Sequence, residues 1–385
     1  MTKKDVFKHS FLIFTLFLTV VITALSISST ITIRRRNIVN QYDFANLQGE
    51  ANRVILFIGD GMGENHLNVA EKYLERTLYM RSFSNNGKVS TFSKNLFIPT
   101  DSAASATAMA TGKKVINREV SYHNKENINT ITEYAKMLGK GVGIVTTDNL
   151  YGATPAAFSS HAADRGDSDT IIKNQIKSNV DIFLGCGKNA YGKYQTEIIN
   201  NGYTFVTSLG ELKNQNHKIL GAFDAISGDN LNPTLIELSL FALSYLEKNY
   251  PDGYFLLIEG AHIDKMSHKN NIIKMIAYLD EFDKTIEEVD KTMRGKTSYT
   301  IIVTADHETG KLKSKGELKE NITDKLYNSK GHTSRDVCYF IKGNLATKKE
   351  YNIQKKIDNT DIYKICYQLL SNKGANNDRY TLSFE

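Results

Sequence analysis

The chain has 385 residues, of which 41% are hydrophobic and 23% are charged, which is ordinary for a globular protein. Its formal net charge of +6 is unevenly distributed, because residues 1–36 carry six basic residues against one acidic residue, which leaves +1 for the remainder. A nearly neutral body excludes a protein that binds nucleic acid through a basic surface. The three cysteines, an odd number, do not describe a disulfide framework.

The N-terminal segment predicts export. From Phe11 to Ile33 it is uncharged and rich in Phe, Leu, Ile and Val, with basic residues on both sides. About 20 apolar residues span a bilayer, whereas a signal peptide has a shorter apolar core and ends at small residues, which are present near Ser26. Residues 1–36 are therefore expected to be either a cleaved signal peptide or a membrane anchor, and the body to be membrane-anchored, periplasmic or extracellular.

Six short apolar runs follow along the chain, and helical patterns separate them. Near-continuous apolar runs are typical of strands covered on both faces, as in a parallel sheet. Their alternation with helices predicts a doubly wound α/β fold, with a mostly parallel central sheet flanked by helices, in one domain over residues 50–385. The runs are 54–58, 142–146, 182–184, 254–258, 299–304 and 337–341, and the helical patterns are 65–76, 130–138, 234–248 and 271–293.

The run of small residues from Pro99 to Gly112 predicts a helix that starts near Ser102. Serine is a favourable N-cap, and alanine favours the helix that follows. Unpaired backbone N–H groups and the helix macrodipole make such a terminus a place for an anion, or for a hydroxyl that attacks one. The alternative, that the small residues only let a neighbouring helix approach, is equally compatible with this stretch alone.

Acidic and histidine side chains follow the predicted strands. Asp60 comes after the first strand, Glu259 after the fourth, and Asp306 and His307 after the fifth. Ligands of open parallel sheets bind outside the carboxyl ends of the strands. Carboxylates that converge there repel one another unless a cation holds them. These four residues therefore predict a metal site at that edge of the sheet.

Two further histidines and an aspartate extend this set. Asp264 and His268 lie four residues apart just after Glu259, and at helical spacing they face one side. His332 precedes the sixth strand and completes the set. Because the chain has no C-x-x-C pair, its metal ligands are oxygens and imidazole nitrogens, which suit zinc, or magnesium at an all-oxygen site. With a serine at a helix start, they indicate phosphoryl chemistry.

These residues lie in motifs that resemble those of the metal-dependent alkaline phosphatases, over nearly all of the body from about Arg53 to Ile341. The motifs occur in the family's order, and the ordered set is highly specific. They are 58–63 (IGDGMG), 100–108 (TDSAASATA), 153–157 (ATPAA), 259–264 (EGAHID), 304–310 (TADHETG) and 332–333 (HT). The resemblance implies the fold of that family, and the short spacing from His307 to His332 leaves little or no room for an extra cap domain.

The resemblance also implies a role for each matching residue. Ser102 is the nucleophile that becomes phosphoserine, and Arg165 is the arginine that binds the phosphate. Two zinc ions and one magnesium ion are implied. Their ligands would be Asp264, His268 and His332 for the zinc that activates water, Asp60, Asp306 and His307 for the zinc beside the serine, and Asp60, Thr154 and Glu259 for the magnesium.

One position departs from the family pattern. Two residues before Thr154 the family commonly has Asp or His, which supports the magnesium site, whereas this chain has Gly152. The departure predicts a magnesium ion that is held weakly, is more hydrated or is replaced. Asp148 is near in sequence but is not expected to substitute. Lys265 follows Asp264, as in some members, and is expected either to contact phosphate through water or to be solvated.

The implied function is the hydrolysis of phosphate monoesters to an alcohol and inorganic phosphate, through a phosphoserine at Ser102. Two alternatives stay open: a phosphodiesterase of the same superfamily, and a noncatalytic, membrane-tethered protein that binds phosphate or zinc. The expected partners are small phosphomonoesters, a membrane if residues 1–36 stay attached, and a second copy in a homodimer, as is frequent in the family. No nucleic acid is expected.

Overall fold

The centre of the structure is a sheet of ten strands, in the order β14-β2-β13-β10-β1-β9-β5-β6-β8-β7. The computed structural model describes residues 15, 16, 18–21, 23, 52–95, 97–212, 217–226, 232–296, 298–313, 321–343 and 355–371. The chain divides into two units, Met1–Asp43 and Phe44–Glu385, and the sheet belongs to the second.

The sheet is mostly parallel, which confirms the prediction. β13 is antiparallel to both of its neighbours, β10 and β2, and the other strand pairs of the sheet are parallel. All six apolar runs form strands, since each is covered on both faces and nearly every residue in it is buried. These strands are β1 (Arg53–Gly59), β5 (Gly141–Asn149), β6 (Ile182–Cys186), β9 (Tyr254–Gly260), β10 (Tyr299–Thr304) and β13 (Val337–Gly343).

Four further strands of the sheet are not predicted by the apolar runs. Two of them, β2 with the sequence NNGKVS and the three-residue β14, have too few apolar residues to form a recognisable run. All four lie towards the two ends of the sheet, where β14 and β7 are the edge strands. The four are β2 (Asn85–Ser90), β7 (Tyr203–Val206), β8 (Lys218–Phe223) and β14 (Lys356–Asp358).

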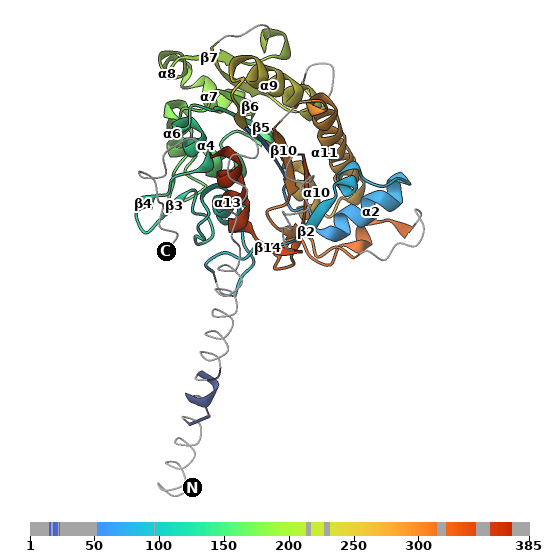
Figure 1. Ribbon diagram of the computed structural model, residues 1–385. Helices are drawn as coiled ribbons and strands as arrows, with labels where there is room; N and C mark the ends of the chain where they lie inside the picture. The colour runs from blue at the N-terminus through green and yellow to red at the C-terminus, as the bar shows by residue number, and fades with distance from the viewer. Residues whose placement is uncertain are drawn as a thin grey trace, which may run out of the picture. The chain divides into compact units, whose positions relative to one another are not determined.

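Helices cover both faces of the sheet, which confirms a doubly wound fold (Figure 1). On one face α9 (Leu235–Asn249) packs on β5 and β9 and contacts α11 (Ile272–Met293). On the other, α4 (Ile131–Met137) packs on the same two strands and contacts α13 (Asn359–Leu370). The other helices are α2 (Glu64–Leu74), α3 (Ser102–Thr111), α5 (Ala153–Ser159), α6 (Ser168–Lys177), α7 (Lys188–Gly192), α8 (Gln195–Asn200) and α10 (His262–His268).

Local sequence signals explain where several of these helices begin. Thr130 and Thr234 each form a capping box, in which the threonine oxygen accepts from the backbone three residues on and a glutamate returns the bond. Such caps satisfy backbone N–H groups that a helix start otherwise leaves unpaired. Along α11, buried residues recur at helical spacing, so one stripe of this helix faces the core.

The carboxyl ends of four neighbouring strands, β10, β1, β9 and β5, meet at one edge of the sheet. Their register pairs Ile58 with both Thr304 and Glu259, and pairs Glu259 with Thr146. The polar residues that follow β1 and β10 therefore lie beside the end of β9. Parallel pairing alone brings together the acidic residues that the sequence separates by up to about 250 positions.

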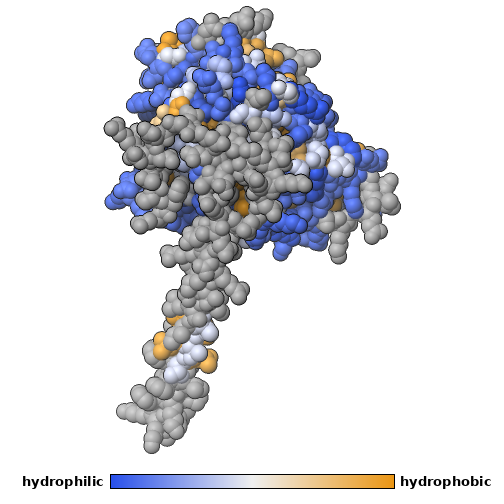
Figure 2. Space-filling model, in the orientation of Figure 1, coloured by the Kyte–Doolittle hydropathy of each residue, from blue (hydrophilic) through white to orange (hydrophobic). Residues whose placement is uncertain are grey.

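The surface of the second unit is mostly hydrophilic on the face shown in Figure 2. Its three cysteines, Cys186, Cys338 and Cys366, are all free thiols. In the first unit the described residues, between 15 and 23, are helical. Most of the segment expected to be a signal peptide or anchor lies outside the described residues. Among those that are described, no helix combines the length and apolar character needed to cross a membrane.

Candidate active site

Ser102 is the first residue of α3, and the N-cap of this helix is Asp101. The expectation that serine caps the helix is therefore wrong by one residue. The Asp101 carboxylate accepts a hydrogen bond from the Ala104 N–H at 2.9 Å, which leaves the serine hydroxyl free of the capping role. Ser102 is buried, and its Oγ lies 3.2 Å from His307 Nε2. The hydroxyl thus faces the histidine that follows β10.

The small residues of α3 serve packing as well as the site. All ten residues of this helix are buried, and the helix contacts both α5 and α13. The Ser105 hydroxyl donates to the Asp306 carbonyl at 2.6 Å, and Asn359 of α13 donates to the same hydroxyl at 2.9 Å. The packing interpretation of the small-residue run is therefore confirmed, and the same close packing places Ser102 against the end of β10.

The predicted ligands gather into two clusters next to Ser102. We call Asp264, His268 and His332 the outer cluster, because its two histidines are partly exposed, and Asp60, Asp306 and His307 the inner cluster, because all three are buried. Within each cluster the candidate ligand atoms lie within 4.8 Å of one another. The structure thus brings together both sets that the sequence analysis names.

The outer cluster turns three ligand atoms towards one point. His268 Nε2 lies 3.2 Å from Asp264 Oδ2 and 3.1 Å from His332 Nε2. The Nδ1 atoms face away, to the backbone carbonyls of Lys330 and, at 2.9 Å, Thr100. A carbonyl can only accept, so each Nδ1 carries a proton, and in the neutral form of each ring Nε2 presents a lone pair to the cluster. The hydrogen bond with Asp264 raises the pKa of His268, and a cation held by these three side chains would take the place of that proton.

The inner cluster leaves two buried oxygens without partners. Asp306 Oδ1 accepts from the backbone N–H groups of Gly61 and His307, at 3.0 and 2.9 Å. Asp306 Oδ2 and Asp60 Oδ1 have no hydrogen-bond partner among the described residues. They lie 3.3 and 3.6 Å from His307 Nε2. Because an unpaired buried polar atom is costly, these two oxygens also point to a bound cation.

Thr309 joins the two clusters, and sequence reasoning assigns it no role. Its hydroxyl donates to Asp264 Oδ1 in the outer cluster and lies 3.2 Å from His307 Nδ1 in the inner cluster. The hydroxyl therefore accepts from Nδ1–H and leaves His307 Nε2 unprotonated towards Ser102. β11 (Glu308–Thr309) pairs with β12 (His332–Thr333), which brings His332 into the outer cluster.

Gly61 permits this close approach. Its φ is +70°, and a Cβ there would lie 2.8 Å from Asp264 Oδ1 and 2.9 Å from Thr309 Oγ1. Any side chain would push the outer cluster away from the inner one.

The residues implied for the third metal lie beside the inner cluster. Thr154 is the second residue of α5, and its buried Oγ1 has no hydrogen-bond partner among the residues that the structure describes. Glu259 Oε2 accepts a hydrogen bond from Thr146 of the neighbouring strand. Glu259 is close enough to Asp60 for their charges to interact. An all-oxygen set of this kind suits magnesium rather than zinc.

Burial and mutual repulsion shift the pKa values of these acids. Burial, and then the charges of Asp306, Asp264 and Glu259, raise the pKa of Asp60 well above its ordinary value. Burial and the Asp148 charge raise the pKa of Glu259 to about 8. Divalent cations would reverse these shifts by pairing with the ionised forms. The repulsion, the two unpartnered oxygens and the facing imidazoles therefore fit metal ions at these positions.

Arg165 approaches Ser102 through Asp101. Its Nη1 lies 3.4 Å from Asp101 Oδ2, and its backbone N–H donates to the Arg118 carbonyl at 2.8 Å. The Arg118 N–H in turn donates to Asp101 Oδ2 at 3.1 Å, and its guanidinium pairs with Asp164 through two bonds of 2.7 Å. Arg118 thus contacts three residues around the Arg165 side chain. They are Asp164, Arg165 itself and Asp101, the residue before Ser102.

Arg118 is also unusual in its backbone. Its φ is +79°, in the region that glycine favours and a bulky residue rarely occupies. Neither Arg118 nor Thr309 carries a local sequence signal, because each acts through partners that are distant in sequence.

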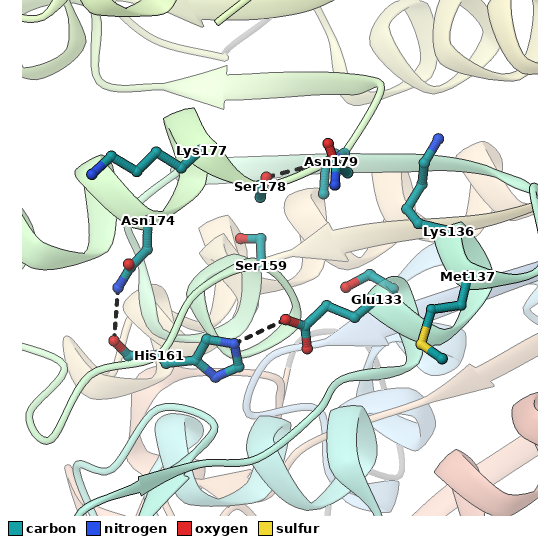
Figure 3. A pocket seen from close by; sticks show the side chains of 11 residues that line it. Glu133, Lys136, Met137, Ser159, His161, Asn174, Lys177, Ser178 and Asn179 are labelled. Carbon is teal, nitrogen blue, oxygen red and sulfur yellow. Dashed lines mark hydrogen bonds and ion pairs between the residues drawn. The ribbon is translucent and has the colours of Figure 1, made fainter. Parts of the chain in front are cut away.

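A cavity of about 500 Å³ lies away from these clusters and contains none of the predicted site residues. It is lined by α4, the end of α6 and the residues before β6 (Figure 3). In it His161 Nε2 contacts Glu133 at 3.1 Å, and Nδ1 contacts the Ser121 carbonyl at 2.8 Å. Both ring nitrogens are satisfied, as expected of a structural histidine.

Comparisons with known proteins agree with the geometry. A family model described as alkaline phosphatase matches residues 51–322. Alkaline phosphatase 4 of Bacillus subtilis is 29% identical over 299 residues, which are 68% of this chain and 62% of that protein. The chain therefore spans less than two thirds of the length of this curated relative.

Solved structures resemble this one over a larger share. The alkaline phosphatase from the Antarctic bacterium TAB5 has a TM-score of 0.74 and 25% identity, and the match covers 83% of this chain and 98% of that one. A cold-active alkaline phosphatase from a psychrophilic Shewanella has a TM-score of 0.75 and 26% identity, over 83% and 100% of the two chains. The chain thus belongs to the alkaline phosphatase family.

Proposed function

We propose that the body of this chain hydrolyses phosphate monoesters, with Ser102 as the nucleophile. The observation that carries the proposal is the place of the Ser102 hydroxyl, at the N-terminus of α3 and 3.2 Å from His307 Nε2. The His307 and His332 rings stack with centroids 3.6 Å apart, so the outer cluster lies directly behind the inner one. A hydroxyl, a helix N-terminus and two sets of metal ligands therefore converge.

The proposal includes metal ions held by the two clusters and by the third site. Zinc suits the imidazole and carboxylate donors of the outer and inner clusters, and magnesium suits Asp60, Thr154 and Glu259. When bound, such ions stabilise the negative charge that develops on the attacking and leaving oxygens. A mutant of the TAB5 enzyme has been solved with Mg bound in its M3 site, which supports a third site of this kind.

Individual residues of the chain then have separate roles in the reaction. Ser102 Oγ attacks phosphorus, and the bond from phosphorus to the alcohol oxygen breaks as the new bond forms. Arg165 binds two phosphate oxygens through its planar guanidinium and is oriented by Asp101. The departing alcohol takes a proton. Water then attacks the phosphoserine, and its proton returns to Ser102 Oγ as inorganic phosphate leaves.

The proposal extends to the whole chain. Residues 1–36 would direct export, as a signal peptide or an anchor, and residues 50–385 would form the catalytic domain. The substrates would be small phosphomonoesters, and a homodimer is proposed by analogy with the family alone.

The test is a comparison of an aryl phosphate with a bis-aryl phosphate, in the presence and absence of a chelator and after separate return of Zn²⁺ and Mg²⁺. We expect faster turnover of the monoester, loss of turnover on chelation and recovery with Zn²⁺. An acid quench followed by mass spectrometry should find phosphate on Ser102. Faster turnover of the diester would favour the phosphodiesterase, and no turnover of either ester by the metal-restored protein would contradict the proposal.

A further inference from the structure

The position left empty by Gly152 is filled by another residue. Gly152 has an ordinary backbone conformation, with φ of −61°, so glycine is not needed there for backbone freedom. A Cβ at this position would lie 3.0 Å from Asp148 Oδ2 and 2.9 Å from the Asn149 carbonyl. The carboxylate of Asp148 therefore occupies the space that a side chain at position 152 would enter.

The end of β5 delivers Asp148 to that space. The pairing of β5 with β6 is irregular between Val145 and Asn149, so the strand bends just before its end. The Asp148 N–H donates to Thr146 Oγ1 at 2.9 Å, and the same hydroxyl donates to Glu259. One threonine hydroxyl thus fixes Asp148 and Glu259 relative to each other.

Lys265 closes the arrangement from α10. Its Nζ forms an ion pair with Asp148 Oδ1, while Oδ2 faces Gly152. The lysine charge also interacts with those of Glu259 and Asp60, both of which are assigned to the third metal site. The carboxylates of Asp148, Glu259 and Asp60 therefore surround the third metal site. Only one ammonium group, that of Lys265, lies among them, so the site has an excess of negative charge.

From this geometry we propose that Asp148 is a positioning residue that replaces the side chain missing at position 152, supporting the third metal and holding Lys265 at the edge of its site. The proposal rests on the proposed function, because that function assigns the third metal to Asp60, Thr154 and Glu259. It differs from the expectation from the sequence that Asp148 does not substitute, and the experiment below decides between the two. Position 152 must then stay small, because Asp148 and a side chain there compete for one space.

The experiment is calorimetric titration of the zinc-loaded protein with Mg²⁺ alone. We expect D148N to weaken Mg²⁺ binding by about 10- to 100-fold, as for other residues that support metal ligands. K265M should tighten it by about two- to fivefold, because a positive charge leaves the site. The double variant D148N/K265M should fall between the two single variants. A purely structural role for the ion pair would weaken binding in all three variants.

Two further variants test the shared space. In the wild-type background G152D should weaken Mg²⁺ binding, because its carboxylate collides with that of Asp148. In the D148A background G152D should restore part of the lost affinity, and G152A, which adds only the contact with the Asn149 carbonyl, should not. Equal effects of G152D in both backgrounds would count against the competition.

The matched control is D224A, which removes aspartate from the Lys188–Asp224 pair. That pair has a lysine as exposed as Lys265, at 40% in each case, but carries no role in the site. D148N with the Mg²⁺ affinity of D224A would overturn the inference. If instead the protein turned over no monoester while D148N still weakened Mg²⁺ binding, the proposed function would fail and this inference would stand.

Discussion

The two clusters and the cavity of Figure 3 differ in whether their polar groups are paired. At the cavity Glu133 contacts His161, and Lys136 donates to both carboxylate oxygens of Asp181, at 2.9 and 2.7 Å. In the inner cluster Asp60 Oδ1 and Asp306 Oδ2 have no hydrogen-bond partner within the described part of the chain. The groups named at the cavity are therefore paired within the protein, whereas the inner cluster keeps two buried oxygens that a cation would pair.

This difference shows that the volume of a cavity does not indicate where the candidate active site of this protein lies. An unpaired polar atom inside a protein costs free energy, and a fold retains it where a ligand or an ion compensates. The clusters are crowded, with stacked rings and a glycine that makes space, whereas the cavity is open and electrostatically satisfied. The four variants below separate the two regions, in order of decreasing effect on activity.

The largest effect is expected for S102A. Removal of the nucleophile should lower kcat/KM for an aryl phosphate by at least about a thousandfold. The thermal unfolding temperature should stay near that of the wild type, because only one oxygen is lost. S178A is the matched control, since Ser178 lines the cavity. Similar losses in the two variants would erase the distinction between the regions.

T309V should weaken the binding of metal ions by the two clusters. Valine keeps the shape of the side chain but leaves Asp264 Oδ1 and His307 Nδ1 without the shared hydroxyl. We expect metal retention to fall by about 10- to 100-fold, measured as zinc content after dialysis against buffers of graded chelator strength. T300V is the control, because Thr300 Oγ1 is buried and none of the described residues forms a hydrogen bond with it. If T300V lost as much zinc as T309V, the hydroxyl that Thr309 shares between the two clusters would not be what retains the metal.

R118G should weaken phosphate binding without weakening the fold. Glycine fits the φ of +79°, so relief of backbone strain should offset loss of the exposed pair with Asp164, which is worth about 0.2–1 kcal/mol. Glycine keeps the backbone hydrogen bonds to Arg165 and Asp101, so only the side-chain pair with Asp164, the residue before Arg165, is lost, and inorganic phosphate should inhibit about two- to fivefold less well. The measurements are the inhibition constant and the unfolding temperature. A large fall in that temperature together with unchanged inhibition would refute the role given to Arg118.

H161Q should leave turnover within about twofold of the wild type and change only how stability depends on pH. Burial lowers the pKa of His161, but the hydrogen bonds with Glu133 and the Ser121 carbonyl outweigh it, so the pKa is raised above 6.5. Protonated His161 therefore stabilises the fold fully below pH 6.5, and this stabilisation is lost as pH rises through the pKa of the folded protein.

The measurement for H161Q is urea unfolding at several pH values. The stability difference between wild type and H161Q should be largest below pH 6.5 and shrink at higher pH. A difference that grew with pH would reverse the assigned sign. A large loss of turnover would show that the cavity shares in the chemistry.

Much of the fold was accessible from the sequence because its core strands are covered on both faces. Burial on both faces demands continuous apolar runs, and such runs stand out without knowledge of their partners. The polar strand β2 gives no such signal, and the apolar run of β13 reads the same in either direction. Strand direction depends on the connection that the chain takes in space.

The residues of the candidate site likewise divide into those that the sequence predicts and those that it does not. Asp60, Glu259, Asp306 and His307 were predictable because they lie at or just after the carboxyl ends of buried strands, which meet at one edge. Thr309 and Arg118 were not, since each acts through hydrogen bonds to residues distant in sequence.

The sequence by itself determined the order of the ligands, the serine at a helix start and the glycine at position 152. What it left undetermined was which side chain lies against that glycine. Only the tertiary structure decided that, because the bend at the end of β5 and the hydroxyl of Thr146 place the Asp148 carboxylate where a Cβ at position 152 would meet it. Whether a carboxylate four residues away reaches a position depends on the path of the backbone, which local sequence patterns do not specify.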